Sequence, residues 1–397
     1  MAFSDLSVDL IYVIFSHLQS DQAELHSLAL SCRQFRDIAQ RFMVRDASIT
    51  HSIKGSRAKL FLRTLLKRPD LVSHVHRLKF DLLREDIHWP EEQQIIHQIT
   101  RRLTNLREFC YLSRDYKFWH YSVPLPLKWE RDHAHDQVRR VEWHHNMAPW
   151  ELRKCMELPR IEAIYVLELQ DISSGRFTSF KVPARKHKTS TLAELRLGSP
   201  DEMAYQSLNM LLHLPKSLKK IAFEARSVHQ SALAPTALVL LLEPARDTLE
   251  ELHLEIYAGK LGPPSRPADL SAFVSLTKLS LPFRYIFAPV VEVQYHADAH
   301  LPTYLQELEI TFIPDRNSPD PATTKYYDAL IGWLRTIDGQ HEVPLRMPSL
   351  TRVTLRRKDH LSVGTDLPAE RLQEVLQGWR SQSEGLAEGR LIVDYHH

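Results

Sequence analysis

Histidine is the residue type whose abundance first suggests chemistry, because the chain holds 22 histidines among 397 residues. The densest local groups are His133-x-His135 and His144-His145. A closed zinc site needs four ligands, and two neighbouring histidines supply only half of them. His341-Glu342 begins the H-E-x-x-H pattern of zinc hydrolases, but Leu345 occupies the place of the second histidine. We therefore expect no metal and no other cofactor.

Local motifs for nucleotide binding and covalent catalysis are also missing from the sequence. It contains no G-x-G-x-x-G, no G-x-x-x-x-G-K-[ST] and no G-x-S-x-G, the patterns that cradle phosphates or expose a nucleophilic serine. Its 11 glycines lie well below the roughly 7% of average usage. We expect no catalytic residues, with an enzyme whose site is assembled from distant residues as an alternative.

Cysteine usage and charge bound the compartment and the partners. The three cysteines, Cys32, Cys110 and Cys155, are far apart and lack C-x-x-C spacing, which argues against a disulfide framework and a zinc knuckle. We expect a reducing compartment, cytoplasmic or nuclear. The 51 Lys and Arg nearly balance the 49 Asp and Glu, so no nucleic-acid partner is expected. The apolar stretch 8–15 is too short to span a membrane.

A basic run and a group of aromatic residues allow two readings each. The run 185–188 is interpreted as a solvated loop, and its alternatives are a nuclear signal or a site for an acidic partner. Tyr116, Trp119, Trp143 and Trp150 lie near one another in sequence and would suit an aromatic anchor for a partner. For Trp143, which falls at a strand position, we expect ordinary core packing.

The N-terminal residues show the spacing of three short helices. Asp21 followed by Glu24 has the capping-box arrangement and predicts the start of the second helix. A third apolar series runs from Phe35 to Met43. Three such helices bury little core by themselves, so part of their apolar surface is expected to belong to a partner. In the first helix the apolar residues three and four apart are Leu10, Ile11, Ile14, Phe15 and Leu18.

This segment resembles an F-box, especially the fungal form. The resemblance covers about residues 4–50 and is carried by the run from Leu6 to Leu18 and by Leu25-x-x-Leu28-Ala29-Leu30-Ser31-Cys32-Arg33-x-Phe35-Arg36. Ser7 departs from the family pattern, which usually has proline after the leucine. Because proline pre-sets the backbone where a helix begins, the serine predicts weaker binding of the adaptor.

The resemblance implies a partner, since an F-box docks on the Skp-family adaptor of a cullin-based ubiquitin ligase. The expected partners are therefore this adaptor and, through it, a cullin. The alternative is that most of the apolar residues are the module's own core. The candidates for the docking face are Leu6, Val8, Leu10, Ile11, Phe15, Leu25, Leu28 and Cys32.

Beyond the module, one pattern recurs along the chain. The unit L-x-x-L-x-L, or a related apolar version, occurs ten times, mostly about 23 to 32 residues apart. Helical spacing at 205–214, 237–242 and 326–334 predicts helices between such units. The ten units begin at Val75, Leu106, Val138, Ile161, Leu192, Leu218, Leu249, Leu276, Leu305 and Leu350.

The recurring units resemble a degenerate leucine-rich repeat, although the asparagine that normally follows the strand is missing from most of them. A strand-and-helix unit cannot bury its apolar side alone, so stacked units share one core. We expect an α+β or α/β solenoid, with an F-box-like helical module at 1–50 and a curved substrate-binding body at 51–397. A capping helix is expected at 370–379, and surface loops at 262–267 and 313–321.

These features predict a substrate-recognition adaptor of a Skp-cullin-F-box ubiquitin ligase, which binds the Skp-family adaptor through its N-terminal module and a protein target through its repeats. The predicted role is non-catalytic, because such a receptor acts by raising the local concentration of a target lysine. The alternative is a protein-interaction scaffold that uses the same repeats and never enters a ligase.

Overall fold

The computed structural model divides into two compact units, one of residues 1–180 and 185–192 and the other of residues 181–184 and 193–397. Each unit combines parallel strands with helices. The residues that the structure describes are 6–19, 21–50, 57–82, 89–113, 135–169, 182–198, 204–224, 234–255, 267–287, 297–312, 330, 333, 347–357 and 392–396.

The first unit begins with the three helices predicted from the sequence, α1 (Val8–His17), α2 (Gln22–Ser31) and α3 (Arg33–Arg45). The Asp21 carboxylate accepts hydrogen bonds from the first backbone N–H groups of α2, as the capping pattern predicted. Cys32 has extended backbone between α2 and α3, and its Sγ accepts the N–H of Phe35 at 3.4 Å. A short side chain with an acceptor thus begins each of the two helices.

Ser7 is the N-cap residue of α1, and the helix entry there keeps the geometry that was expected to be lost without a proline. Its φ of −61° lies where a proline ring would hold it, so the backbone enters the helix in the same way. Its Oγ also accepts the backbone N–H of Leu10 at 3.3 Å, a cap that proline lacks. The serine therefore keeps the entry geometry and satisfies one more backbone donor.

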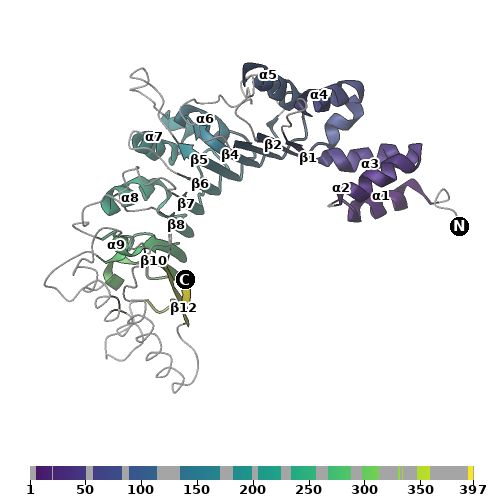
Figure 1. Ribbon diagram of the computed structural model, residues 1–397. Coiled ribbons are helices and arrows are strands. Elements are labelled where there is room, and N and C mark those ends of the chain that lie inside the picture. Colours follow the sequence, from purple (N-terminus) through teal and green to yellow (C-terminus); the bar gives the residue numbers. More distant parts are fainter. Residues whose placement is uncertain are drawn as a thin grey trace, which may run out of the picture. The chain divides into compact units, whose positions relative to one another are not determined.

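Five parallel strands continue the first unit, paired in sequence order. Helices cover one face of these strands (Figure 1). β1 lies inside residues 1–50, so this range contains the first strand of the sheet as well as the helices. The elements are β1 (Asp46–Thr50), α4 (Arg57–Lys67), η2 (Pro69–His74), β2 (Arg77–Leu82), α5 (Trp89–Thr100), β3 (Glu108–Ser113), β4 (Arg140–Met147), α6 (Pro149–Met156) and β5 (Ala163–Leu169).

The second unit repeats the arrangement with seven parallel strands, again paired in sequence order. Here too the helices lie on one face (Figure 1). Its elements are β6 (Glu194–Leu197), α7 (Ala204–Leu211), β7 (Lys220–Glu224), α8 (Pro235–Leu242), η6 (Glu243–Ala245), β8 (Glu251–Glu255), β9 (Lys278–Pro282), α9 (Phe283–Ile286), η7 (Ala297–His300), β10 (Glu307–Phe312), β11 (Arg352–Arg357) and β12 (Ile392–His396), while η5 (Ala184–Lys186) falls where the residue ranges of the two units interleave.

Each of the ten apolar units predicted from the sequence supplies one strand, from β2 to β11. The apolar positions of all ten L-x-x-L-x-L repeats are buried, as shown by Val75, Leu78 and Phe80 in the first repeat. In β3 and β4 the buried Tyr111 and Trp143 stack at 4.3 Å between ring centroids, so Trp143 packs in the core as expected. An α/β architecture of stacked strand-and-helix units is thus confirmed.

Small polar side chains just before several strands form hydrogen bonds to the preceding strand-and-helix repeat. The Asn105 amide donates to the carbonyl of Ser73 at 2.8 Å, and the Thr248 hydroxyl donates to that of Leu218 at 2.9 Å. The Thr191 hydroxyl likewise donates to the carbonyl of Ile161 at 2.7 Å. These bonds satisfy backbone carbonyls that lie shortly before the neighbouring strand. The repeat pattern did not indicate which residues would do so, because most repeats lack the usual asparagine.

Helix predictions within the body are confirmed for α7 and α8, which overlap the predicted segments 205–214 and 237–242 and begin one and two residues before them. In the segment 326–334 the described residues Leu330 and Trp333 are helical. The predicted cap at 370–379 and the loop 313–321 lie outside the described residues, as does the loop 262–267 apart from Pro267. None of the described helices has both the length and the apolar character needed to cross a bilayer.

Candidate functional site

The three N-terminal helices pack around an aromatic core. The Phe15 ring meets Phe35 edge-on at 5.6 Å between centroids and lies 6.4 Å from Phe42. Ile11 and Leu25 are wholly buried beside these rings. The helical spacing of Ile11 and Phe15, four residues apart, places both on the face of α1 that meets α3.

α1 also has apolar side chains that no described part of the chain covers. Val8, Leu10 and Val13 are each more than half exposed, and Ile14 is 36% exposed. Leu30, near the end of α2, is 67% exposed. We call Val8, Leu10, Val13, Ile14 and Leu30 the apolar face of the module. Such exposure on a segment of this size is typical of a surface that binds another protein.

The eight residues predicted to dock the adaptor fall into three groups. Ile11, Phe15 and Leu25 are fully buried and hold the module together, so their side chains do not reach its surface. Leu6 and Leu28 are partly buried and pack against the same core. The remaining three are exposed, and these are Val8, Leu10 and Cys32.

The apolar face also contains residues that the sequence reasoning passed over. Val13, Ile14 and Leu30 lie on it without having been among the docking candidates. Seven of the ten residues of α1 are apolar or aromatic. Since the helix is apolar nearly all round, its sequence does not indicate which stripe faces inward.

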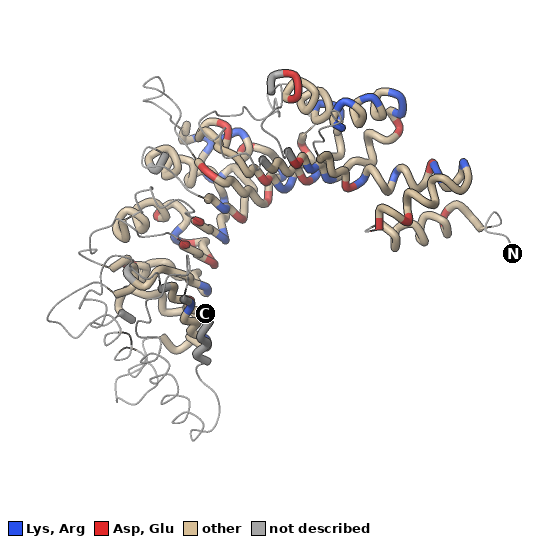
Figure 2. The backbone as a smooth tube through the Cα atoms, viewed as in Figure 1, with Lys and Arg blue, Asp and Glu red and all other residues tan. Residues whose placement is uncertain are grey.

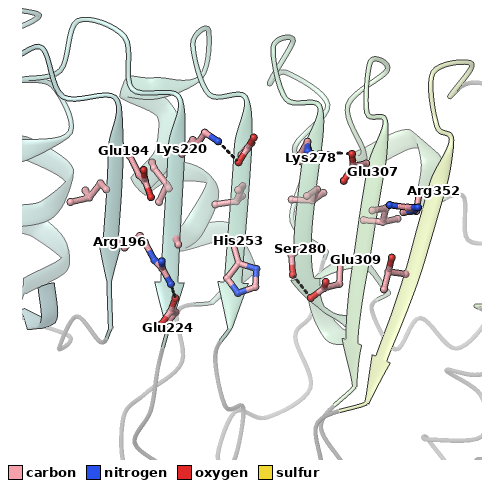
Figure 3. A pocket seen from close by; sticks show the side chains of 18 residues that line it. Glu194, Arg196, Lys220, Glu224, His253, Lys278, Ser280, Glu307, Glu309 and Arg352 are labelled. Carbon is pink, nitrogen blue, oxygen red and sulfur yellow. Dashed lines mark hydrogen bonds and ion pairs between the residues drawn. The ribbon is translucent and has the colours of Figure 1, made fainter. Parts of the chain in front are cut away.

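The second unit presents a row of charged residues on the face of its sheet opposite the helices. The register places six residues side by side across β6 to β11, and the sign of their charge alternates along the row. Figure 3 shows several of these side chains in contact across neighbouring strands. In strand order they are Glu194, Lys220, Glu251, Lys278, Glu307 and Arg352.

Ion pairs join neighbours within this row. Lys220 Nζ lies 2.9 Å from a Glu251 carboxylate oxygen, and Lys278 Nζ lies 3.2 Å from one of Glu307. The hydrogen bond to Glu251 raises the pKa of Lys220. Exposed pairs of this kind contribute little stability each, but opposite charges directly across from one another favour this register over a shifted one.

A shallow hollow of about 430 Å³ lies over the same face of the second unit. Its lining includes His253 of β8, Ser280 of β9 and Glu309 of β10, with the Ser280 hydroxyl donating to Glu309 at 3.0 Å (Figure 3). Arg196 of β6 and Glu224 of β7, which also line the hollow, form an ion pair. The hollow therefore offers donors and acceptors of both signs, a chemistry suited to a mixed polar surface more than to a strongly charged ligand.

The first unit has its own row of alternating charge on the corresponding face. Asp46, Arg77, Glu108 and Arg140 lie side by side across β1 to β4. Arg77 donates to Glu108 at 2.6 Å, and this bond raises the pKa of Arg77. Within each unit, red and blue residues follow one another across the strands (Figure 2).

The cysteines occupy three different environments. Cys32 is exposed at the start of α3, and Cys155 is fully buried in α6, where burial raises its pKa. Cys110 lies on the face of β3 opposite the buried Phe109 and Tyr111, beside Glu142 and His144 of β4. Burial and the neighbouring Glu142 raise the pKa of Cys110 to about 12. Residue spacing in the sequence does not indicate this cluster of Cys110, Glu142 and His144, because its members come from two strands.

The basic run 185–188 lies mainly in solvent, in line with the interpretation as a solvated loop. Lys186 Nζ lies 3.9 Å from a Glu157 carboxylate oxygen. Trp150 is 40% exposed and has Lys154 Nζ 5.0 Å above its ring, whereas Tyr116 and Trp119 lie outside the described residues. No aromatic anchor is therefore assembled from the described members of that group.

Comparison of the chain with protein-family models and with curated protein sequences gave no match. The two candidate surfaces, the apolar face of the N-terminal helices and the polar face of the second unit, are accordingly interpreted from their own chemistry.

Proposed function

We propose that this chain is a substrate receptor of a Skp-cullin-F-box type ubiquitin ligase. In this role the apolar face of α1 and α2 docks on the Skp-family adaptor, and the uncovered strand faces of the body hold a protein target. The chain itself is non-catalytic, and it acts by placing the target near a ubiquitin carrier held by other subunits.

The observation that carries the proposal is the exposure of Val8, Leu10, Val13 and Leu30 on a module that already has a complete core of its own. Burying the remaining exposed half of such side chains yields about 1 kcal/mol for each residue. Four of them together therefore offer about 4 kcal/mol before any polar contact is counted. The F-box resemblance of residues 4–50, which contain these side chains, supplies the identity of the partner.

The polar face of the second unit supports the assignment of the target. Its charges are largely paired with one another, as in the contacts of Lys220 with Glu251 and Lys278 with Glu307. A target must then offer both donors and acceptors, since a surface of one sign would leave part of the row opposed by like charge. We propose a folded or extended protein segment of mixed charge as the ligand of this face.

A non-ligase scaffold is the second candidate, because the apolar face would suit other helical partners as well. The two roles differ in whether the adaptor-bound chain also recruits a cullin. The decisive experiment mixes the purified full chain with the Skp-family adaptor of its host and then adds the cullin, with complex formation followed by size-exclusion chromatography. A ternary complex supports the receptor role.

The other results of this experiment are equally informative. Binding of the adaptor without the cullin favours the scaffold, and no binding of the adaptor by a folded chain overturns both the docking assignment and the ligase role. Deletion of residues 1–50 is a poor control, because it removes β1 along with the helices and exposes the edge of β2. Single substitutions on the apolar face avoid this damage.

A further inference from the structure

Three side chains of different chemistry converge on the face of β3 and β4 opposite the buried Phe109 and Trp143. Cys110 of β3 lies directly opposite Glu142 of β4 in the parallel register. His144 follows Glu142 by two residues on the same strand, so both point to the same side of the sheet. One ligand atom from each of the three residues lies within 4.8 Å of the others, and all three side chains are partly buried.

We infer that Cys110, Glu142 and His144 form a binding site for a zinc ion that links β3 to β4. A thiolate, a carboxylate and an imidazole are the three ligand types that zinc takes in proteins, at about 2.0 to 2.3 Å. Ligand atoms around a tetrahedral zinc lie about 3.3 to 3.8 Å apart. The ligand atoms lie within 4.8 Å of one another, so side-chain rotations that move them about 1 Å closer suffice. The strands need not move.

The ligand set selects the class of metal. A sulfur ligand disfavours calcium and magnesium, which prefer oxygen, and favours zinc or a similar transition metal. The Cys110 thiolate and the Glu142 carboxylate balance the two charges of the ion. Binding converts the thiol to a zinc thiolate and releases its proton to solvent. Three protein ligands leave a fourth position open for water or for a donor group of a bound target.

Neighbouring residues both order the site and limit its affinity. The His144 ring packs on Tyr165 of β5 at 4.6 Å between centroids, which restricts its rotation. Arg140 Nε lies 3.4 Å from one carboxylate oxygen of Glu142, so zinc competes with this guanidinium or uses the second oxygen. Lys79 of β2 stands opposite Cys110 and adds a second positive charge nearby. We expect an affinity below that of closed structural sites, whose four ligands leave no open position.

Cobalt provides the direct test, because a cysteine thiolate bound to Co²⁺ gives a charge-transfer absorption in the near ultraviolet. The full chain, stripped of metal with a chelator, is titrated with Co²⁺ and then with Zn²⁺. We expect the charge-transfer band to appear with one equivalent of Co²⁺ and to be displaced by Zn²⁺. Absence of the band in the wild-type chain overturns the assignment.

Variants separate this site from adventitious binding by the other histidines. Cys110→Ser should abolish the band, and His144→Gln should weaken Zn²⁺ binding by at least about tenfold in competition with a chromophoric chelator. Cys32→Ser, which removes an exposed cysteine from the start of α3, is the matched control and should leave both signals unchanged.

A band that survives in Cys110→Ser, or disappears in Cys32→Ser, refutes the site. Circular dichroism checks that each variant is folded, and His144→Gln decides the matter if Cys110→Ser does not fold.

Discussion

Replacing Leu10 by aspartate tests the apolar face most directly, because the change should affect docking and leave folding intact. Leu10 is 53% exposed and occupies the first turn of α1. An acidic residue there interacts favourably with the positive end of the helix dipole. Its backbone N–H, which donates to Ser7 Oγ, is retained. We therefore expect the free energy of unfolding to change by no more than about 0.5 kcal/mol.

The effect on adaptor binding should be much larger. Loss of the apolar contact removes about 1 kcal/mol, and desolvation of an unpaired carboxylate in the interface adds several kcal/mol. A total above about 3 kcal/mol raises the dissociation constant more than about 100-fold. Leu10→Ala, which removes only the apolar contact, should weaken binding about fivefold.

The assay is isothermal titration calorimetry of the full chain with the purified Skp-family adaptor. Leu60→Asp is the matched control, since Leu60 lies on α4 and has the same exposed fraction, 53%. We expect this variant to bind as the wild type does. If folded Leu10→Asp binds within about threefold of the wild type, or if Leu60→Asp weakens binding equally, the apolar face is not the docking surface.

Three further predictions concern the core, pH and the cysteines. Phe15→Ala should destabilise the chain by about 3 to 5 kcal/mol in urea unfolding, because the ring is fully buried; a loss below about 1 kcal/mol would contradict this role. Burial lowers the pKa of His145 from 6.5, so the unfolded state binds more protons and stability should decrease as pH falls below about 6.5. His145→Asn should show a smaller decrease in melting temperature between pH 7 and pH 5, and an equal decrease would argue against this histidine. In metal-free protein at pH 8, iodoacetamide should modify exposed Cys32 first, since Cys155 is buried and a pKa of about 12 leaves Cys110 only about 0.01% thiolate; mass spectrometry of the labelled peptides decides the order.

The strand-and-helix repetition could be predicted from the amino-acid sequence alone, because the information lies in short-range spacing. In each L-x-x-L-x-L repeat the last two apolar residues are two apart and lie on the buried face of the strand, as do Leu252 and Leu254 of β8. The first apolar residue, such as Leu249, lies just before the strand and is buried too. The start of α2 at Asp21 was equally local, since a cap depends on the next three residues. The cap that Ser7 provides for α1 was not predicted. The strands β1 and β12, which have no such unit, were not predicted.

The inward side of α1, by contrast, depended on tertiary packing. Ile11 and Leu10 are neighbours of similar apolar character, yet packing against Phe35 and Phe42 buries Ile11 and leaves Leu10 exposed. The register of β3 and β4 likewise brings Cys110 to Glu142 across 32 residues of sequence, a distance over which residue spacing carries no information. The sequence predicted the repeats better than the sites because strands and caps depend on local contacts, whereas docking surfaces and metal ligands depend on long-range ones.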